Sequence, residues 1–176
     1  LFGLGAIKNV GGACVEAILQ ARKEGGKFVS VEDFCTRMDY KAMNKKAVES
    51  LIRCGAFDEI SPNRAWLSTK VEGALALAAS ASRDKERGQG TLFGLMEEAG
   101  PGAKKGVEQA PKDFPDWPKR DQLKAEKELL GFYVTGHPAD EFEADLRAFR
   151  TLNLGEPEEM QSGTAARLAG VVTAVE

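Results

Sequence analysis

The stretch "AIKNVGGACVEAI", residues 6–18, predicts a tight turn that leads directly into a helix. Asn9 stands in the turn, and Asn tolerates a left-handed backbone conformation better than most residues other than Gly. Gly11 and Gly12 follow at the start of the helix and carry no Cβ atom. The backbone N–H groups at such a helix start can approach a phosphate closely, and Lys8 adds a positive charge beside them.

The same pattern is typical of the hairpin in a helix-hairpin-helix unit, with Asn9 in the place of the first Gly, Val10 as the apolar residue and Gly11 as the second Gly. Backbone contacts to phosphate carry no base information, so we expect binding to duplex DNA without sequence preference. From the motif alone, an ordinary Gly-rich loop that caps a helix is an equal alternative. The candidate DNA-binding residues are Lys8, Asn9, Val10, Gly11, Gly12 and Ala13.

A second, degenerate hairpin is indicated by "LIRCGAFDEISPNRAWL", residues 51–67. It lacks the second Gly and carries Asp58 and Glu59, which repel phosphate. We therefore predict a tandem pair in which the first hairpin contacts DNA and the second mainly packs.

Apolar periodicity and capping residues predict four helices in residues 1–82. The first covers 13–23 and stops at Gly25 and Gly26, and the second opens at Ser30, with Asp33 in a capping-box arrangement. Asn44 is expected to cap the third, which ends at Gly55. The fourth is expected to start at Ser61-Pro62, with Pro62 as its first residue, and to continue to about residue 82.

The remaining sequence divides into three further parts, so the predicted fold class is mainly α. Residues 83–120 are rich in Gly, Pro and charged residues and predict an extended linker. Residues 121–160 predict a helical segment, including an amphipathic helix with Phe142, Leu146 and Phe149 on one face. The alternation in residues 161–176 predicts the first strand of a truncated β domain. Together with the tandem helix-hairpin-helix domain at 1–82, this gives four parts.

Charge is spread unevenly over the 176 residues, whose net charge is −3. Residues 1–87 hold 14 Lys and Arg against 11 Asp and Glu, whereas residues 88–176 hold 10 against 16. A mildly basic half and an acidic half suggest two different partners. No apolar run is long enough to span a bilayer and no signal peptide is recognisable, so a cytoplasmic location without membrane contact is expected. The missing initial Met and the final strand-like run suggest a piece of a longer polypeptide.

Residues that could do chemistry are not grouped in this sequence. The three cysteines, Cys14, Cys35 and Cys54, lack C-x-x-C spacing and His137 is the only histidine, so no zinc site is expected. The cysteines are predicted to be buried small residues in a reducing compartment. No nucleophile elbow or P-loop is present, and no catalytic residue or metal ligand is assigned.

Five stretches, in order and spacing, resemble the alpha subunits of bacterial DNA polymerase III, the C-family replicative polymerases. They are "FGLGAIKNVG", "FVSVEDFCTRMD", "NKKAVESLIRCGAFD", "NRA" and "KAEKELLGFYVTGHP". The resemblance covers nearly the whole chain and is weakest in the linker. It implies a C-terminal segment that follows the catalytic palm and fingers, with tandem helix-hairpin-helix units, a clamp-binding peptide and the start of an OB-fold at "RLAGVVTAVE". The palm aspartates that hold two Mg²⁺ ions would lie outside this chain, and this segment would need no cofactor.

The resemblance also suggests a role for "GQGTLFGL", residues 88–95, whose adjacent Leu and Phe have no periodic apolar neighbours. In that family a Gln-x-x-Leu-Phe peptide docks on the ring-shaped beta sliding clamp. Gln89, Leu92 and Phe93 stand at the matching positions. Two bulky apolar groups can enter a pocket on another protein while the Gln amide bonds at its rim. Gly90 must be ordered on binding and is expected to weaken the contact.

The leading hypothesis is therefore a non-catalytic DNA-binding and clamp-binding segment of a DNA-directed DNA polymerase. Its expected partners are primer-template duplex, the beta sliding clamp and other subunits of the replicase holoenzyme. One alternative is a helix-hairpin-helix module of a repair nuclease or ligase, which should show a catalytic Lys or a carboxylate cluster nearby. A second alternative is an interaction scaffold whose hairpins pack without touching DNA.

Overall fold

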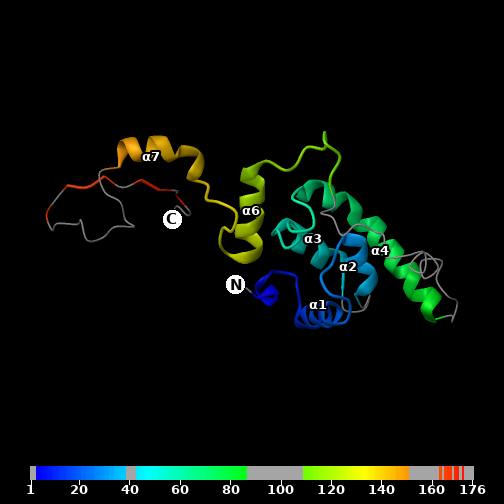
Figure 1. Ribbon diagram of the computed structural model, residues 1–176. Coiled ribbons are helices and arrows are strands. Elements are labelled where there is room, and N and C mark those ends of the chain that lie inside the picture. Colours follow the sequence, from blue (N-terminus) through cyan, green and yellow to red (C-terminus); the bar gives the residue numbers. More distant parts are fainter. Residues whose placement is uncertain are drawn as a thin grey trace. The chain divides into compact units, whose positions relative to one another are not determined.

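The computed structural model describes residues 3–38, 43–86 and 109–150 together with residues 163, 165–167, 169–170 and 172. Within these ranges all regular secondary structure is helical (Figure 1). The mainly α class is thus confirmed for the described part of the chain. The β-strand expected within 161–176 stays a prediction, since most of those residues lie outside the described ranges and the few that are described form no strand.

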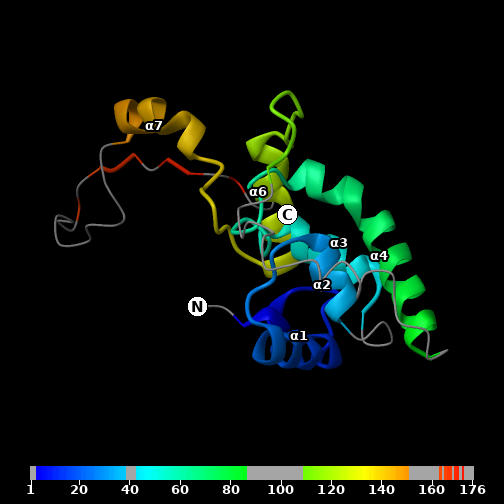
Figure 2. The same cartoon turned by 45° about the vertical axis from the view of Figure 1, so that its right-hand side comes forward.

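The four helices expected at the N-terminal end are present. A short 3-10 turn, η1 (Leu4–Ala6), precedes α1 (Gly12–Gly25), and α2 (Val31–Arg37), α3 (Lys45–Arg53) and α4 (Arg64–Glu86) follow. In both ribbon views α2 lies alongside the long α4 (Figures 1 and 2). α3 contacts α4 and also α6 (Lys119–Leu130), which comes much later in the chain.

Two of the predicted helix caps are observed as hydrogen bonds. The Ser30 hydroxyl accepts from the N–H of Asp33 at 3.0 Å, and the Asn44 side chain accepts from the N–H of Ala47 at 2.8 Å. The Asp33 carboxylate accepts in return from the N–H of Val29, one residue earlier than a standard capping box would place it. These caps satisfy N–H groups that the helices themselves leave unpaired.

The predicted start of α4 at Pro62 is wrong. Its first helical residue is Arg64, and the side chain of Asn63 accepts from the N–H of Trp66 at 2.8 Å. Asn is among the best N-cap residues, so Asn63 sets the boundary and Pro62 lies before it. The helix also continues to Glu86, about one turn beyond the predicted end.

Each of these helices contributes buried side chains to the hydrophobic core. Phe34 lies at its centre, with its ring edge-on to Phe28 at 4.9 Å and to Phe57 at 5.0 Å between ring centroids. Such edge-to-face pairs add to the stability gained from burial. The core residues with no more than 2% exposure include Ile18, Val31, Cys35, Val48, Leu51, Ile52, Leu67 and Val71.

The helix α6 belongs to the same compact unit as the first four helices, and that unit ends at Phe132. Leu129 of α6 is part of the main core. Residues 109–118, which the sequence assigned to a linker, lie against α4, because Asn63 donates to the carbonyl of Phe114 at 2.9 Å. The boundaries drawn from the sequence at 82 and 120 therefore do not coincide with this compact unit.

A second unit covers Tyr133–Glu176. Its described helices are the 3-10 turn η2 (Asp140–Phe142) and α7 (Glu143–Phe149). His137 lies just before η2. Its N–H donates to the Asp140 carboxylate at 2.7 Å, and its Nδ1 accepts from the N–H of Ala139. Phe142 and Phe149, predicted to share an apolar face, are 56% and 68% exposed.

Candidate nucleic-acid interface

The first hairpin adopts the turn that its sequence predicts. Asn9 has φ +72, so it occupies the left-handed conformation expected of the residue that replaces Gly. The N–H of Val10 donates to the carbonyl of Ile7 at 3.1 Å and closes the turn. Ile7 and Val10 are both 6% exposed. These two buried side chains anchor the turn to the core and leave the following residues at the surface.

The start of α1 is exposed and has no side-chain cap. Gly11 is the N-cap residue, and no side chain bonds to the first turn. Gly11, Gly12 and Ala13 are exposed, and no hydrogen bond within the described residues engages their backbone N–H groups. By contrast, side chains cap α2, α3 and α4. The first hairpin therefore presents free backbone donors at the positive end of a helix dipole.

Nothing in the described fold requires Gly at positions 11 and 12. Gly11 has φ −76, which other residues adopt readily. A Cβ atom added to either residue would meet nothing within 4 Å. The effect of the two glycines is to keep the surface over the free N–H groups clear of side chains, which suits the close approach of a phosphate.

The six predicted DNA-binding residues lie together at the first hairpin, but they do not contribute equally. The N–H of Lys8 donates to the carbonyl of Leu129 at 2.9 Å, and that of Val10 is used within the turn. The side chain of Asn9 donates to the Ser50 hydroxyl at 3.0 Å. Free backbone donors therefore remain at Gly11, Gly12 and Ala13, while the exposed side chain of Lys8 supplies charge.

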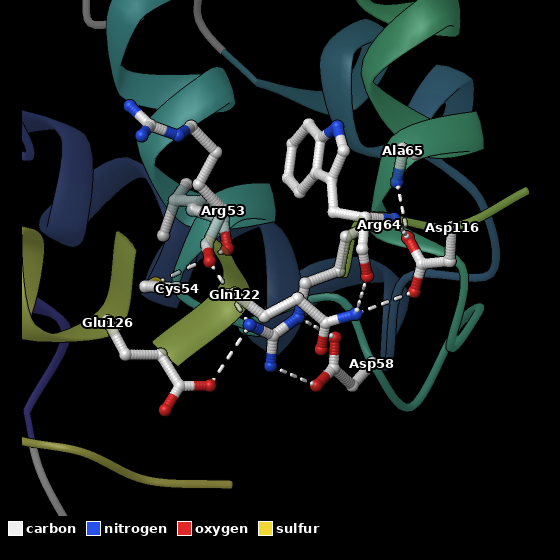
Figure 3. A network of polar contacts seen from close by, with 10 residues as sticks. Arg53, Cys54, Asp58, Arg64, Ala65, Asp116, Gln122 and Glu126 are labelled. Atoms are coloured by element: carbon white, nitrogen blue, oxygen red, sulfur yellow. Dashed lines mark hydrogen bonds and ion pairs between the residues drawn. The ribbon is translucent and has the colours of Figure 1, made fainter. Parts of the chain in front are cut away.

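The corresponding helix start in the second hairpin is already occupied. A carboxylate oxygen of Asp116 accepts from the N–H of Ala65 at 2.9 Å, and Gln122 donates to the other oxygen at 2.9 Å (Figure 3). With Asn63 bonded to Trp66, the start of α4 has two capping side chains. The Asp116 carboxylate places a negative charge at this helix start, and that charge would repel a phosphate.

Arg64 holds the second hairpin together through a buried network that the sequence reasoning missed. Its guanidinium donates to both carboxylate oxygens of Asp58, at 2.9 and 2.6 Å, and to Glu126 at 3.0 Å (Figure 3). A further bond reaches the carbonyl of Arg53 at 3.1 Å. Arg64 lies in "NRA", one of the five stretches of the resemblance, but periodicity offered no sign that this Arg is buried.

The cysteines behave as the sequence predicts. Cys14, Cys35 and Cys54 are free and buried. Burial raises the pKa of all three thiols, and that of Cys35 rises to about 12 through burial and the nearby Glu32 carboxylate. The thiolate is the reactive form of cysteine, so these groups are unsuited to nucleophilic catalysis at neutral pH.

Metal binding and membrane insertion can also be compared with the described residues. In the ranges that the structure covers, no group of three or more His, Cys, Asp or Glu side chains is arranged to hold a metal ion. Across the same residues, no helix is both long and apolar enough to cross a membrane. The predicted clamp-binding residues Gln89, Leu92 and Phe93 lie outside the described residues.

The exposed first hairpin, the capped second hairpin and the helices around them are the features of a helix-hairpin-helix region. A family described as the helix-hairpin-helix motif matches residues 1–67. Along almost its whole length the chain is also similar to proteins named DNA polymerase III subunit alpha. Those of Vibrio cholerae, Neisseria meningitidis serogroup A and Escherichia coli K12 are 38%, 39% and 34% identical, each over 99% of this chain.

The family recognised in the sequence is thus confirmed: this chain corresponds to one segment of the DNA polymerase III alpha subunits. It spans only about 15% of the length of these relatives. These relatives carry the name of a DNA polymerase subunit and not of a repair nuclease or ligase, the alternative considered from the sequence.

Proposed function

We propose that this chain is a DNA-contacting, non-catalytic segment of a bacterial replicative DNA polymerase. The full-length protein would be a DNA-directed DNA polymerase, acting in the cytoplasm where the chromosome lies. The names of the relatives support that activity, and its Mg²⁺ ions would be held by a palm domain outside this chain. The segment would grip the duplex behind the active site while nucleotides are added.

The observation that carries the proposal is the difference between the two hairpins. At the start of α1 the N–H groups of Gly11, Gly12 and Ala13 are exposed and free. At the start of α4 the Asp116 carboxylate bonds the N–H of Ala65, the equivalent of Ala13, and the side chain of Asn63 bonds the N–H of Trp66. A phosphate oxygen could therefore accept hydrogen bonds at the first hairpin without displacing a capping side chain, and Lys8 would strengthen the contact by charge.

We also propose that Gln89, Leu92 and Phe93 form a ligand for the beta sliding clamp. The helix α4 ends at Glu86, and Asn63, next to the start of the same helix, donates to the carbonyl of Phe114. The intervening stretch could cover about 90 Å when extended, whereas α4 is only about 34 Å long. It is therefore long enough to reach a separate protein. Binding to the clamp would keep the polymerase on its template.

Duplex binding by a Gly11→Val variant tests the proposed hairpin contact. A Cβ at Gly11 meets open space, so the fold should survive, while the branched side chain would block the phosphate. We expect a loss of about 1–3 kcal/mol in binding free energy on every duplex sequence tested. Gly73→Val, at an equally open position on α4, is the matched control and should bind as the wild type does. Unchanged binding by folded Gly11→Val would favour the scaffold alternative.

A further inference from the structure

The turn of the first hairpin is held by hydrogen bonds to two helices that lie far from it in the sequence. Its backbone donates from the N–H of Lys8 to the carbonyl of Leu129 on α6, at 2.9 Å. Its side chain at Asn9 donates to the hydroxyl of Ser50 on α3, at 3.0 Å. Ser50 is 4% exposed and lies 41 positions further along the chain. Two elements remote in sequence thus fix the turn that precedes the exposed N–H groups.

We propose that Ser50 and α6 are positioning elements of the DNA-contacting hairpin, and that the buried pair Arg64–Glu126 fixes the position of α6. The inference rests on the proposed DNA contact of the first hairpin. None of these three residues would touch the DNA itself. Their effect would be on the direction in which the free N–H groups of Gly11, Gly12 and Ala13 point.

Ser50 acts on the conformation of the turn. Asn9 has φ +72, a conformation that residues with a Cβ visit infrequently. The bond from its amide to the Ser50 hydroxyl favours that conformation over the extended alternatives. Ser50 is rigidly placed because it lies on α3 among Val48, Leu51 and Ile52, which are all buried. Loss of the hydroxyl would leave the turn free to sample other conformations.

The pair Arg64–Glu126 acts on the position of α6. Glu126 is fully buried and lies one helical turn before Leu129, whose carbonyl receives the N–H of Lys8. A slide or rotation of α6 would pull the buried carboxylate away from the guanidinium, and separating a buried ion pair is strongly unfavourable. The pair therefore holds α6, and with it the Leu129 carbonyl, in one register.

The same guanidinium also reaches the helix that carries Ser50. It donates to the carbonyl of Arg53, the last residue of α3, at 3.1 Å (Figure 3). Arg64 thus ties α3 and α6 together at one point, and each of these helices supplies one support of the first hairpin. Hydrogen bonds prefer near-linear geometry and weaken steeply below about 120°, so a tilt of the hairpin that bends these bonds would reduce its affinity for phosphate.

The first arm of the test compares Ser50→Ala with Ser68→Ala in the 176-residue chain, by fluorescence anisotropy with a short labelled duplex. Ser68 is the matched control because its hydroxyl also bonds within the fold, to the carbonyl of Arg64, and makes no contact with the first hairpin. Alanine is a good helix former, so both variants should fold. We expect Ser50→Ala to bind the duplex threefold to tenfold more weakly, and Ser68→Ala to bind within twofold of the wild type.

The second arm needs no DNA. In Glu126→Gln, hydrogen exchange at the Lys8 amide should accelerate at least fivefold, because its acceptor on α6 is less well held. Exchange at the Val15 amide, which bonds to the Gly11 carbonyl at 3.1 Å, should stay within twofold of the wild type. Equal acceleration at both amides would mean general destabilisation and would overturn the inference.

The outcomes separate this inference from the proposed function. If wild-type protein binds duplex and folded Ser50→Ala binds equally well, the positioning role is wrong and the DNA contact stands. If wild-type protein does not bind duplex at all, the proposed function fails, and selective exchange at Lys8 would still support the link between α6 and the hairpin.

Discussion

The Nη1 atom of Arg64 lies 3.0 Å from a carboxylate oxygen of Glu126, 62 positions further along the chain. The two side chains are 2% and 0% exposed. Asp58 binds the other side of the guanidinium (Figure 3). This contact joins a helix that follows the predicted linker to the helices that precede it, and all of these helices belong to one compact unit.

Breaking this buried pair should be costly. Glu126→Ala leaves the guanidinium of Arg64 with Asp58 as its remaining carboxylate and removes one buried charge-assisted hydrogen bond, so we expect a loss of about 1.5–3 kcal/mol in the free energy of unfolding. The control is Lys27→Ala, which removes the surface pair Lys27–Glu59, whose side chains are 76% and 84% exposed. Surface pairs contribute little, so this control should change stability only slightly. Urea unfolding measures both, and similar losses in the two variants would contradict the structure of the network.

Gly55 should tolerate no side chain. Its φ is +85, and a Cβ atom there would lie 2.2 Å from Nη2 of Arg64. Gly55→Ala therefore combines backbone strain of about 1–3 kcal/mol with displacement of the guanidinium. Gly73→Ala, where a Cβ meets open space within α4, should instead stabilise the protein by up to about 1 kcal/mol. A thermal melt of each variant gives the sign of the change, and a Gly55→Ala protein as stable as the wild type would count against the hairpin geometry.

The buried thiols predict how stability depends on pH. Burial raises the pKa of Cys35 from 9.0 to about 12 in the folded protein. Between these values the unfolded chain loses the proton that the folded chain keeps, so stability should fall as the pH rises from about 9. Cys35→Ala removes this contribution, and its unfolding free energy should fall less steeply between pH 9 and 10.5 than that of the wild type. Parallel curves for the two proteins would mean that Cys35 is not shielded from water.

Removal of Leu92 and Phe93 by alanine should abolish binding to the clamp and leave the melting temperature nearly unchanged. Full burial of each side chain contributes roughly 1.5–3 kcal/mol, so the double variant should lose several kcal/mol of binding free energy. Gln89→Ala should lose about 1 kcal/mol for one neutral hydrogen bond. Surface plasmon resonance with an immobilised clamp and a thermal melt give the two quantities. A destabilised double variant that still binds the clamp would show that these residues pack within the chain.

Local signals in the sequence predicted most of the N-terminal helices. Ser30 and Asn44 cap their helices as expected, because capping depends on residues three positions apart. Asn9 adopts the left-handed turn conformation for an equally local reason. The error at Pro62 arose because two neighbouring residues can each start a helix and the capping bond of Asn63 is the stronger preference.

Local capping and turn signals do not predict contacts between residues that are distant in the sequence. Asp116 bonds to the start of α4 from 51 positions away, and Glu126 pairs with Arg64 from 62 positions away. Neither acid differs locally from a solvated surface residue, so residues 109–118 looked like a linker. The same limit explains why the sequence marked Lys8 and Gly11 as a site without showing that Ser50 and Leu129 support it.

The salt dependence of duplex binding tests the central claim most directly, through two charge reversals on α1 and its hairpin. Lys8→Glu changes the charge beside the free N–H groups, while Lys23→Glu makes the same change in the last turn of the same helix, about 20 Å away. Salt screens charges over roughly 10 Å, so only the nearer one should act on a phosphate at the hairpin. We predict that Lys8→Glu weakens binding and lowers the slope of log affinity against log salt by about one, the value for one lost phosphate contact. Equal effects of the two reversals, or none from Lys8→Glu, would contradict the account.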